Sequence, residues 1–390
     1  MSDRRTSLRE LGLLFLRLGT TSFGGPAAHI ALMEDEVVRR RGWLTREQFL
    51  DYVGATNLIP GPNSTELAIH IGHARGGWPG LLVAGVCFIV PAALLVTLAA
   101  WIYVDYGRLP AVSGVLYGVK PVVIAVVGQA LWHLGRTALK SRWLVLLGVA
   151  SAVAVAAGAN ELVVLAAAAV SSALVQRSST AGSASSVVAL TAGATVSTNI
   201  AAAAAASAPV GFGLWPLFLV FLKIGSVLFG SGYVLLAFLR SDLVERLHWL
   251  SEAQLLDAVA VGQVTPGPVF TTATFVGYVL GGPAAAAVAT VGIFLPAFVF
   301  VALSGPLVPR VRRSAVAGAV LDGVNVASLA LMAVVSWNLG RSALIDAPTI
   351  AIACASAVAL LKYRVNSTWL IAAGAGVGWL VLTLASRPGP

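Results

Sequence analysis

The chain has 390 residues, of which 58% are hydrophobic and only 11% are charged, and its mean hydropathy is +0.89. Average soluble domains carry about 25% charged residues, and several apolar runs here reach the ~20 residues that cross a bilayer as a helix. This composition excludes an ordinary soluble domain. It predicts an all-α polytopic membrane protein with roughly 10–13 membrane segments.

The net charge of +9 comes largely from basic residues in short loops between the apolar runs. Such clusters are typical of the cytoplasmic loops of membrane proteins, so we expect a lipid bilayer and no nucleic acid as partner. The two cysteines, Cys87 and Cys354, lie singly in apolar segments and offer neither a disulfide framework nor zinc-ligand spacing. We expect no metal and no cofactor.

One pattern of residues occurs twice along the chain. Residues 15–19 (Phe-Leu-Arg-Leu-Gly) return at 221–225 (Phe-Leu-Lys-Ile-Gly), an offset of 206 residues. The register continues as far as Pro91 and Pro296, where the offset has become 205 because the second copy has lost one residue. Register sustained over this length predicts two homologous halves.

Each copy predicts the same series of elements. An apolar helix is interrupted at a Phe-Gly pair, and an amphipathic connection with a tryptophan follows. A helix broken by Pro-Gly-Pro then leads through a Gly-Gly turn into two long spans, and further apolar segments complete the copy. We assign the first repeat to residues 1–175, a linker to 176–213, with an apolar run at 187–208 that either crosses the membrane or lies on it, and the second repeat to 214–390.

The basic excess moves from one copy to the other between successive connections. The loop at 39–41 is strongly basic and its counterpart at 245–247 is neutralised, whereas the loop at 105–108 is nearly neutral and its counterpart at 310–313 is basic. Two copies inserted with opposite topology would show this alternation. We therefore predict an inverted-topology repeat with a cytoplasmic N-terminus.

The triplets Pro60-Gly61-Pro62 and Pro266-Gly267-Pro268 lie inside otherwise helical sequence. Proline lacks an N–H group and clashes with the preceding turn, so each triplet predicts the end of one helix and the start of another. At membrane depth, irregular backbone survives only inside protein or beside a watery cavity. A broken helix in each of two similar halves is the expected binding site of a transporter.

A helix that begins after such a triplet points its first amide groups into the gap, and helix N-termini bind anions. Hydroxyl and amide side chains nearby add donors that suit a tetrahedral oxyanion, or else they only cap and pack the broken helices. Together with the two triplets, we expect substrate contacts from Asn57, Asn63, Ser64 and Thr65 in the first copy and from Gln263, Thr271 and Thr272 in the second.

An acid, Glu66, lies in the first turn after the first triplet, and His70 follows one turn later. Ionisable groups inside a membrane are costly and functional by default. This favours a proton-coupling site at Glu66 that shares its proton with His70; the alternative is a structural or solvent-facing carboxylate. The second copy has Thr272 and Val276 at these positions, so any proton site is asymmetric.

Matched cations, Arg17 and Lys223, lie in the first helix of each copy. They either attract an anion inward or extend their long side chains to the membrane interface. Lys120 is a further candidate cation, and Asn325 stands at its matching position.

The interruption of the first helix also contributes candidates. We expect substrate contacts at Gly24 and Gly25, at the matching Gly230, and at His29, which follows the first interruption. A packed, hydrogen-bonded structural histidine is the alternative for His29.

Residues 23–30, Trp43-Leu44 and residues 57–66 closely resemble the chromate ion transporter (CHR) family, and residues 263–268 resemble its second domain. The resemblance covers nearly the whole chain. It implies a two-domain, long-chain protein of the bacterial inner membrane that exports chromate and confers chromate resistance. Sulfate is a close chemical analogue that the motif residues do not separate from chromate.

The second copy departs from the pattern of the first. Ser231-Gly232-Tyr233 replaces Gly25-Pro26-Ala27, and no histidine stands opposite His29. The two half-sites are therefore expected to differ.

The sequence thus predicts a secondary transporter that exports chromate, driven by an ion or proton gradient, rather than an enzyme, and no Walker A motif for ATP hydrolysis is present. The rival interpretations are a transporter or channel for sulfate or another oxyanion, and an intramembrane enzyme that acts on a lipid phosphate. The oligomeric state is open between a monomer and a homodimer.

Overall fold

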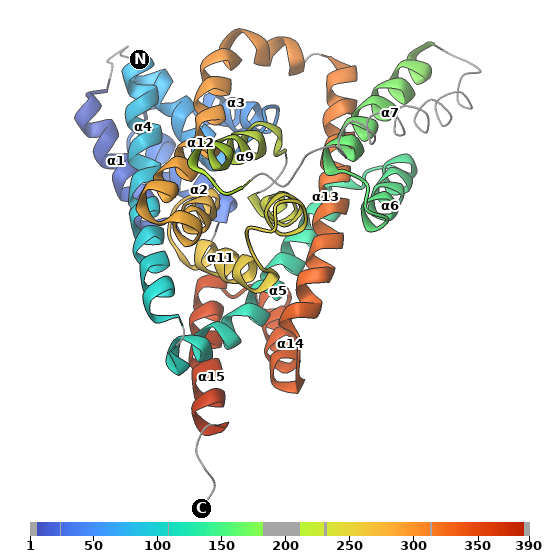
Figure 1. The fold of residues 1–390 in the computed structure, drawn as a ribbon. Coiled ribbons are helices and arrows are strands. Elements are labelled where there is room, and N and C mark those ends of the chain that lie inside the picture. Colours follow the sequence, from blue (N-terminus) through green and yellow to red (C-terminus); the bar gives the residue numbers. More distant parts are fainter. Residues whose placement is uncertain are drawn as a thin grey trace, which may run out of the picture.

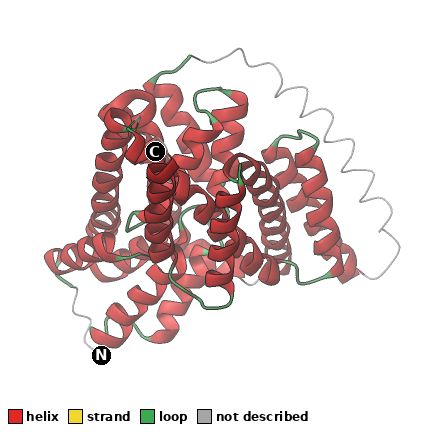
Figure 2. Cartoon of the chain, turned by 90° about the horizontal axis from the view of Figure 1, so that it is seen from below, coloured by secondary structure: helices red, strands yellow, loops and turns green. Residues whose placement is uncertain are grey.

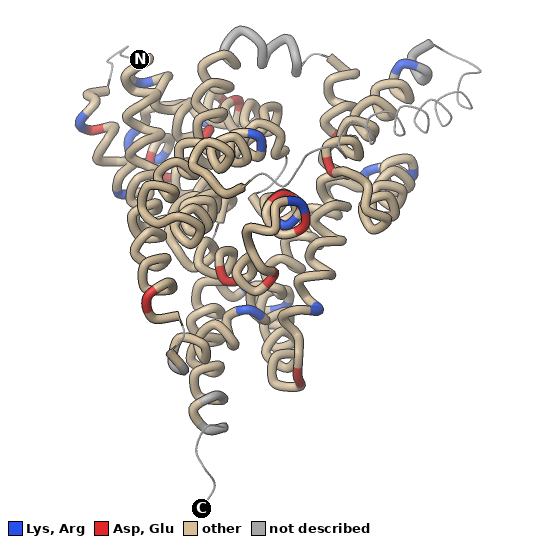
Figure 3. The backbone as a smooth tube through the Cα atoms, in the orientation of Figure 1, with Lys and Arg blue, Asp and Glu red and all other residues tan. Residues whose placement is uncertain are grey.

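The computed structural model describes residues 6–23, 25–107, 109–181, 211–229, 232–312 and 314–385. Within these ranges all regular secondary structure is helical (Figure 2), which confirms the predicted all-α class. Long stretches of helix carry no charged residue (Figure 3). Most of the predicted linker, including the apolar run at 187–208, lies outside the described residues.

Both halves contain the same order of elements. The first half consists of α1 (Leu8–Thr21), α2 (Gly25–Glu34), the π-helix η1 (Asp35–Arg40), α3 (Arg46–Thr56), α4 (Asn63–Tyr106), α5 (Pro110–Ala138), α6 (Arg142–Ala156) and α7 (Glu161–Ala181). The second half consists of α9 (Leu214–Val227), η2 (Gly232–Val234), α10 (Leu235–Leu239), the π-helix η3 (Arg240–Arg246), α11 (Glu252–Val264), η4 (Val269–Thr271), α12 (Thr272–Arg312), α13 (Ala315–Ala343), α14 (Ala347–Leu361) and α15 (Ser367–Ala385).

The helix that leads to each break starts at a capping box. The side chain of Thr45 accepts the amide proton of Gln48 at the start of α3, and the side chain of Gln48 accepts the amide proton of Thr45. Ser251 and Gln254 make the matching pair at the start of α11. These reciprocal bonds satisfy two amides that the first turn of a helix leaves without partners, so both helices begin at equivalent residues.

The elements α4 and α12 each reverse direction at a glycine. Gly77 (φ 62°) interrupts α4, and Gly282 (φ 72°) interrupts α12. Positive φ is a conformation that side chains disfavour, which explains the Gly-Gly turns in the sequence. Gly72 and Gly80 lie on opposite sides of the first reversal, and a Cβ on either would collide with the carbonyl of the other. Each element is therefore a short helix folded back on a long one.

Four helical stretches within the described ranges are long and apolar enough to cross a membrane, namely Asn63–Tyr106, Val112–Ala138, Val269–Ser304 and Ala315–Ala343. Shorter apolar helices of 10–17 residues accompany them, at Arg142–Ala156, Leu214–Val227, Ala347–Leu361 and Ser367–Val381. The apolar helices of the described ranges therefore fall into two groups. One group is long enough for a full crossing of the membrane, and the other is shorter than the ~20 residues that a full crossing needs.

The two halves exchange their last helices. The pair α6 and α7 packs on α13 of the second half, and the pair α14 and α15 packs on α5 of the first half. Matched glycines permit both contacts: a Cβ on Gly118 would collide with the backbone of α15 at Gly374, and one on Gly323 would collide with α7 at Ala168 and Ser172. Small residues let membrane helices approach closely.

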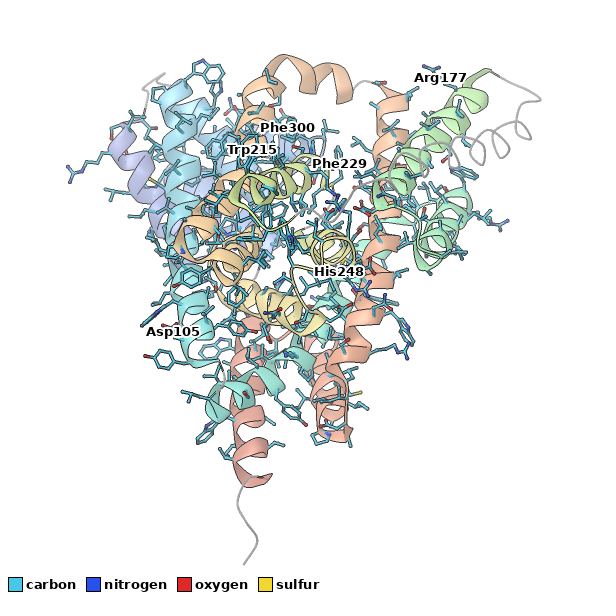
Figure 4. The ribbon with its side chains drawn as sticks, viewed as in Figure 1. Asp105, Arg177, Trp215, Phe229, His248 and Phe300 are labelled. Carbon is cyan, nitrogen blue, oxygen red and sulfur yellow. The ribbon has the colours of Figure 1, made fainter. Side chains whose placement is uncertain are left out.

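The halves also run in opposite senses. In Figure 1, α4 ends at the lower left, where α5 begins, whereas α12 ends at the top, before α13. Asp105, near the end of α4, and Phe300, on α12, lie correspondingly far apart in Figure 4. This arrangement agrees with the predicted inverted repeat.

Candidate functional site

Each Pro-Gly-Pro triplet is a non-helical break, as expected. The first joins α3 to α4, and the second joins α11 to η4 and α12. Gly61 has φ 139° and Gly267 has φ 91°. Since residues with a Cβ rarely adopt these angles, each break depends on its glycine.

The two breaks are bonded reciprocally to the opposite half. The amide of Gly61 donates to the carbonyl of Leu228 at 2.8 Å, and the amide of Gly267 donates to the carbonyl of Ser22 at 2.9 Å. Gly61 matches Gly267, and Ser22 matches Leu228, at the 206-residue offset. Exchange of the same contact between matched residues is what a two-fold axis produces, so both breaks lie beside one pseudo-two-fold axis.

A cavity of about 460 Å³, here called the central cavity, lies between the two helix starts. It is lined by Pro26, Ala27, Asn57, Pro62, Asn63, Ser64, Gln129, Ala130, His133, Leu134, Gly232, Val269 and Phe270. Three matched pairs contribute to it, which are Pro26 with Gly232, Asn63 with Val269, and Ser64 with Phe270. Among these described residues there is no lysine, arginine, aspartate or glutamate.

The start of α4 presents amide groups to the central cavity. The amides of Thr65 and Glu66 donate to the carbonyl of Pro62 at 2.8 and 3.0 Å. Those of Asn63 and Ser64 precede these bonds and have no partner within the helix. The amide nitrogen of the Asn63 side chain donates to Asn57 Oδ1 at 2.9 Å. This bond fixes both asparagines at the cavity wall.

His29 lies outside the cavity lining and forms a hydrogen bond with the hydroxyl of Ser64, which lines the cavity. Its Nε2 lies 3.1 Å from the carbonyl of Ser22, and its Nδ1 lies 3.3 Å from Ser64 Oγ. Because a carbonyl only accepts, Nε2 carries the proton, and Nδ1 of the neutral ring accepts the hydroxyl proton of Ser64. While His29 is neutral, Ser64 therefore turns its lone pairs away from His29. His29 itself is 1% exposed and does not line the central cavity.

Glu66 is fully buried, and neither carboxyl oxygen has a hydrogen-bond partner among the described residues. Its Oε1 lies against the first break, where a Cβ on Gly61 would collide with it. His70 stacks on the ring of Tyr52, with centroids 5.5 Å apart, rather than bonding to Glu66. The predicted sharing of a proton between Glu66 and His70 is therefore not a direct hydrogen bond in this conformation. The hydroxyl of Thr65 is likewise buried and unbonded.

The second break uses its polar side chains differently. The hydroxyls of Thr271 and Thr272 donate to the carbonyls of Pro268 and Val269, each at 2.8 Å. Gln263 is buried, and its amide nitrogen has no partner among the described residues. The two threonines thus bond to their own backbone, which makes the two half-sites unequal.

The matched cations are engaged in matched ion pairs. Arg17 lies 3.5 Å from Glu36, and Lys223 donates to Asp242 at 2.6 Å. Glu36 and Asp242 are themselves matched at the 206-residue offset, on η1 and η3. Burial raises the pKa of the Asp242 carboxyl above its ordinary value, against the opposing effect of Lys223. Neither cation lines the central cavity.

Of the remaining expected contacts, Gly25 (φ 77°) is the first residue of α2 and precedes Pro26, which lines the central cavity. Gly24 and Gly230 lie outside the described residues.

Sequence reasoning missed two polar residues of the cavity wall. Gln129 and His133 both come from α5 and, four residues apart, lie on one face of that helix. The amide nitrogen of Gln129 also donates to the carbonyl of Leu360 at 3.3 Å. The sequence feature that could have identified them is a pair of polar residues, four positions apart, in an otherwise apolar helix.

Two further cavities are related to each other by the repeat. One, of about 300 Å³, is lined by Thr137, Lys140, Asp322 and Asn325 among others; the second, of about 640 Å³, is lined by their counterparts Ser342, Ile345, Tyr117 and Lys120. The smaller one shares Asn57 and Leu134 with the central cavity, and the larger one shares none of its described lining. The central cavity therefore continues toward the basic loop at 136–142 and away from the larger cavity.

Broken helices in two inverted halves, with a cavity between them, define this chain as a membrane transporter with an internal repeat. A family model described as Chromate transporter matches residues 9–173 and 215–379. The chain belongs to the chromate transporter family.

Curated relatives agree with this assignment. The chain is 31% identical over 387 residues to the chromate transport protein of Cupriavidus metallidurans, covering 96% of this chain and 93% of that protein. It is also 31% identical over 386 residues to the chromate transport protein of Pseudomonas aeruginosa, with coverage of 96% and 92%. A probable chromate transport protein of Synechococcus elongatus is 29% identical over 362 residues, with coverage of 88% and 87%. No solved structure matches the chain.

Proposed function

We propose that this chain exports chromate across the bacterial inner (plasma) membrane, binds the anion in the central cavity, and so confers chromate resistance. The observation that carries the proposal is the cavity itself, because matched residues of both broken helices line it. The names of the relatives support chromate as substrate. Sulfate, another tetrahedral dianion of similar size, is the alternative substrate.

In this proposal the anion is bound by the free amides of Asn63 and Ser64 together with the side chains of Asn57 and Gln129. The other residues expected from the sequence shape the breaks or hold neighbouring helices. Pro60, Gly61 and Pro62 set the direction of α4, and Pro266, Gly267 and Pro268 set that of the second helix start.

The coupling group in this proposal is Glu66. An ionised carboxylate without partners is costly in apolar surroundings, and its contact with Gly61 ties its charge to the geometry of the break. The basic loops favour a cytoplasmic N-terminus. With that orientation, the central cavity continues toward the cytoplasm, which is the side from which an exporter takes up its substrate.

The proposal is tested by the flux of radiolabelled chromate into everted membrane vesicles, with and without an imposed proton gradient. Wild type, Glu66→Gln and the exposed control Glu47→Gln are compared. We expect gradient-driven accumulation in wild type and the control, competition by unlabelled sulfate, and loss of the gradient effect in Glu66→Gln.

Gradient-driven accumulation that persists in Glu66→Gln would show that Glu66 is not the coupling group, although the proposed transport of chromate would still stand. Wild-type flux no greater than that of empty vesicles, under any gradient, would overturn chromate as the substrate.

A further inference from the structure

The central cavity offers little positive charge for the proposed ligand. Its described lining holds no lysine or arginine. Arg17 is paired with Glu36, and Lys223 with Asp242 and with Glu161 of the first half. A helix N-terminus carries roughly half an elementary charge, so the helix starts at Asn63 and Val269 together offset about one negative charge. A dianion would keep about one further charge without compensation, which is costly away from bulk water.

His133 is the one ionisable side chain among the described residues of the cavity wall. Its side chain is exposed at the wall of this cavity. Histidine is the side chain whose charge ordinarily changes between about pH 5 and 8. A protonated imidazole would supply the missing positive charge and an N–H donor at the same point.

We propose that protonated His133 is the positive group that binds the oxyanion dianion in the central cavity, so that binding takes up one proton. This inference rests on the proposed function, because it concerns the ligand of the same cavity. When the anion enters, the imidazole takes a proton from a hydronium ion of the solvent, whose O–H bond breaks as the N–H bond forms, and the proton returns to solvent water when the anion leaves. No other covalent bond forms or breaks.

The nearest fixed charges lie on the route to the central cavity. Arg136 follows His133 on α5, and Lys140, just beyond the end of this helix, is paired with Asp322 of α13 at 2.8 Å. The other ionisable groups on elements that pack against α5 or lie behind the cavity wall are Glu252 and Asp257 on α11, Arg341 on α13, Cys354 on α14, and His29 and Glu66 behind Ser64. Of these, Asp257 is paired with Lys120, and Glu252 with Arg240.

The repeat supplies a neutral counterpart to His133. Asn338 stands at the matching position of α13, and Val334 matches Gln129. The titratable group therefore belongs to one half alone. His133→Asn introduces the residue that the second half carries, and His133→Lys introduces a charge that persists across the tested pH range.

The experiment measures sulfate binding to the purified full-length protein by calorimetry between about pH 5 and 8. Sulfate stays a dianion throughout this range, whereas chromate itself gains a proton, so the pH dependence with sulfate reports the protein. The control variant is His248→Gln, because His248, labelled in Figure 4, lies outside the cavity lining and is exposed. Buffers of different ionisation enthalpy give the number of protons taken up, and chromate binding is measured at the alkaline end.

We expect the affinity of wild type and of His248→Gln for sulfate to fall by up to about tenfold for each pH unit of alkalinisation, as binding linked to one proton requires. His133→Asn should bind weakly and change by less than about twofold over the range, and His133→Lys should bind well without pH dependence. Wild-type affinity independent of pH, or an unchanged pH profile in His133→Asn, would overturn the role of His133. Absence of sulfate binding to wild type at every pH, together with absence of chromate binding at the alkaline end, would instead overturn the proposed function.

Discussion

Lys120 of the first half lies 3.0 Å from Asp257 of the second half, and this ion pair joins α5 to α11. The hydroxyl of Tyr103 donates to the same carboxylate at 2.9 Å. All three residues line the larger cavity, on the side away from the basic loop at 136–142. These two partly buried contacts between the halves therefore lie on the side toward which the central cavity does not continue.

Asp257→Asn should destabilise the protein by about 2 kcal/mol, because it leaves the partly buried Lys120 without its countercharge. The control is Asp322→Asn, which breaks the more exposed pair between Lys140 and Asp322 and should cost less than about 1 kcal/mol. Thermal unfolding in detergent measures both. Equal losses in the two variants would show that the pair of Lys120 and Asp257 has no special role in joining the halves.

Gly61→Ala and Gly267→Ala should both abolish transport and lower the free energy of unfolding by about 1–3 kcal/mol. Each imposes a positive φ on alanine, and the new Cβ would meet Glu66 in the first case and Ala92 in the second. Gly128→Ala is the control, since nothing lies within 4 Å of its Cβ. Vesicle flux and thermal unfolding are the measurements, and normal flux in either break variant would contradict the importance of the breaks.

Ser64→Ala should change chromate affinity by less than about twofold, because the Ser64 hydroxyl donates its one proton to Nδ1 of His29 and keeps none for the anion. The control is Ser171→Ala, whose hydroxyl donates only to the carbonyl of Ala168 in its own helix. Equilibrium binding to the purified protein tests this. A loss of affinity of more than about threefold relative to the control would mean that the Ser64 hydroxyl donates to the ligand rather than to His29.

Gly118→Ala and Gly323→Ala should each destabilise the protein by about 1–3 kcal/mol, because the added methyl group collides with a helix of the other half. Gly318→Ala, on the same helix as Gly323, has open space at its Cβ and is the control. The variants are compared by thermal unfolding. A stabilisation in the two test variants would argue against the exchange of terminal helices between the halves.

The sequence by itself determined the features that depend on local backbone chemistry and on register. Pro-Gly-Pro removes amide donors and its prolines do not fit a helix interior, so the breaks could be placed without a structure. The repeat followed from matching residues at a constant offset, and the alternation of basic loops implied its inverted sense. The resemblance to the chromate transporter family rested on these same stretches.

Only the tertiary structure decided which side chains meet across the chain. Arg17 and Lys223 carry the same charge signal in the sequence as a ligand-binding cation would, but packing places each beside a matched acid on η1 or η3. Gln129 and His133 reach the cavity because α5 crosses beside the breaks of both halves, which no local pattern encodes. Pairing between distant segments depends on how helices pack, and helix packing is set by the whole chain rather than by any one stretch of it.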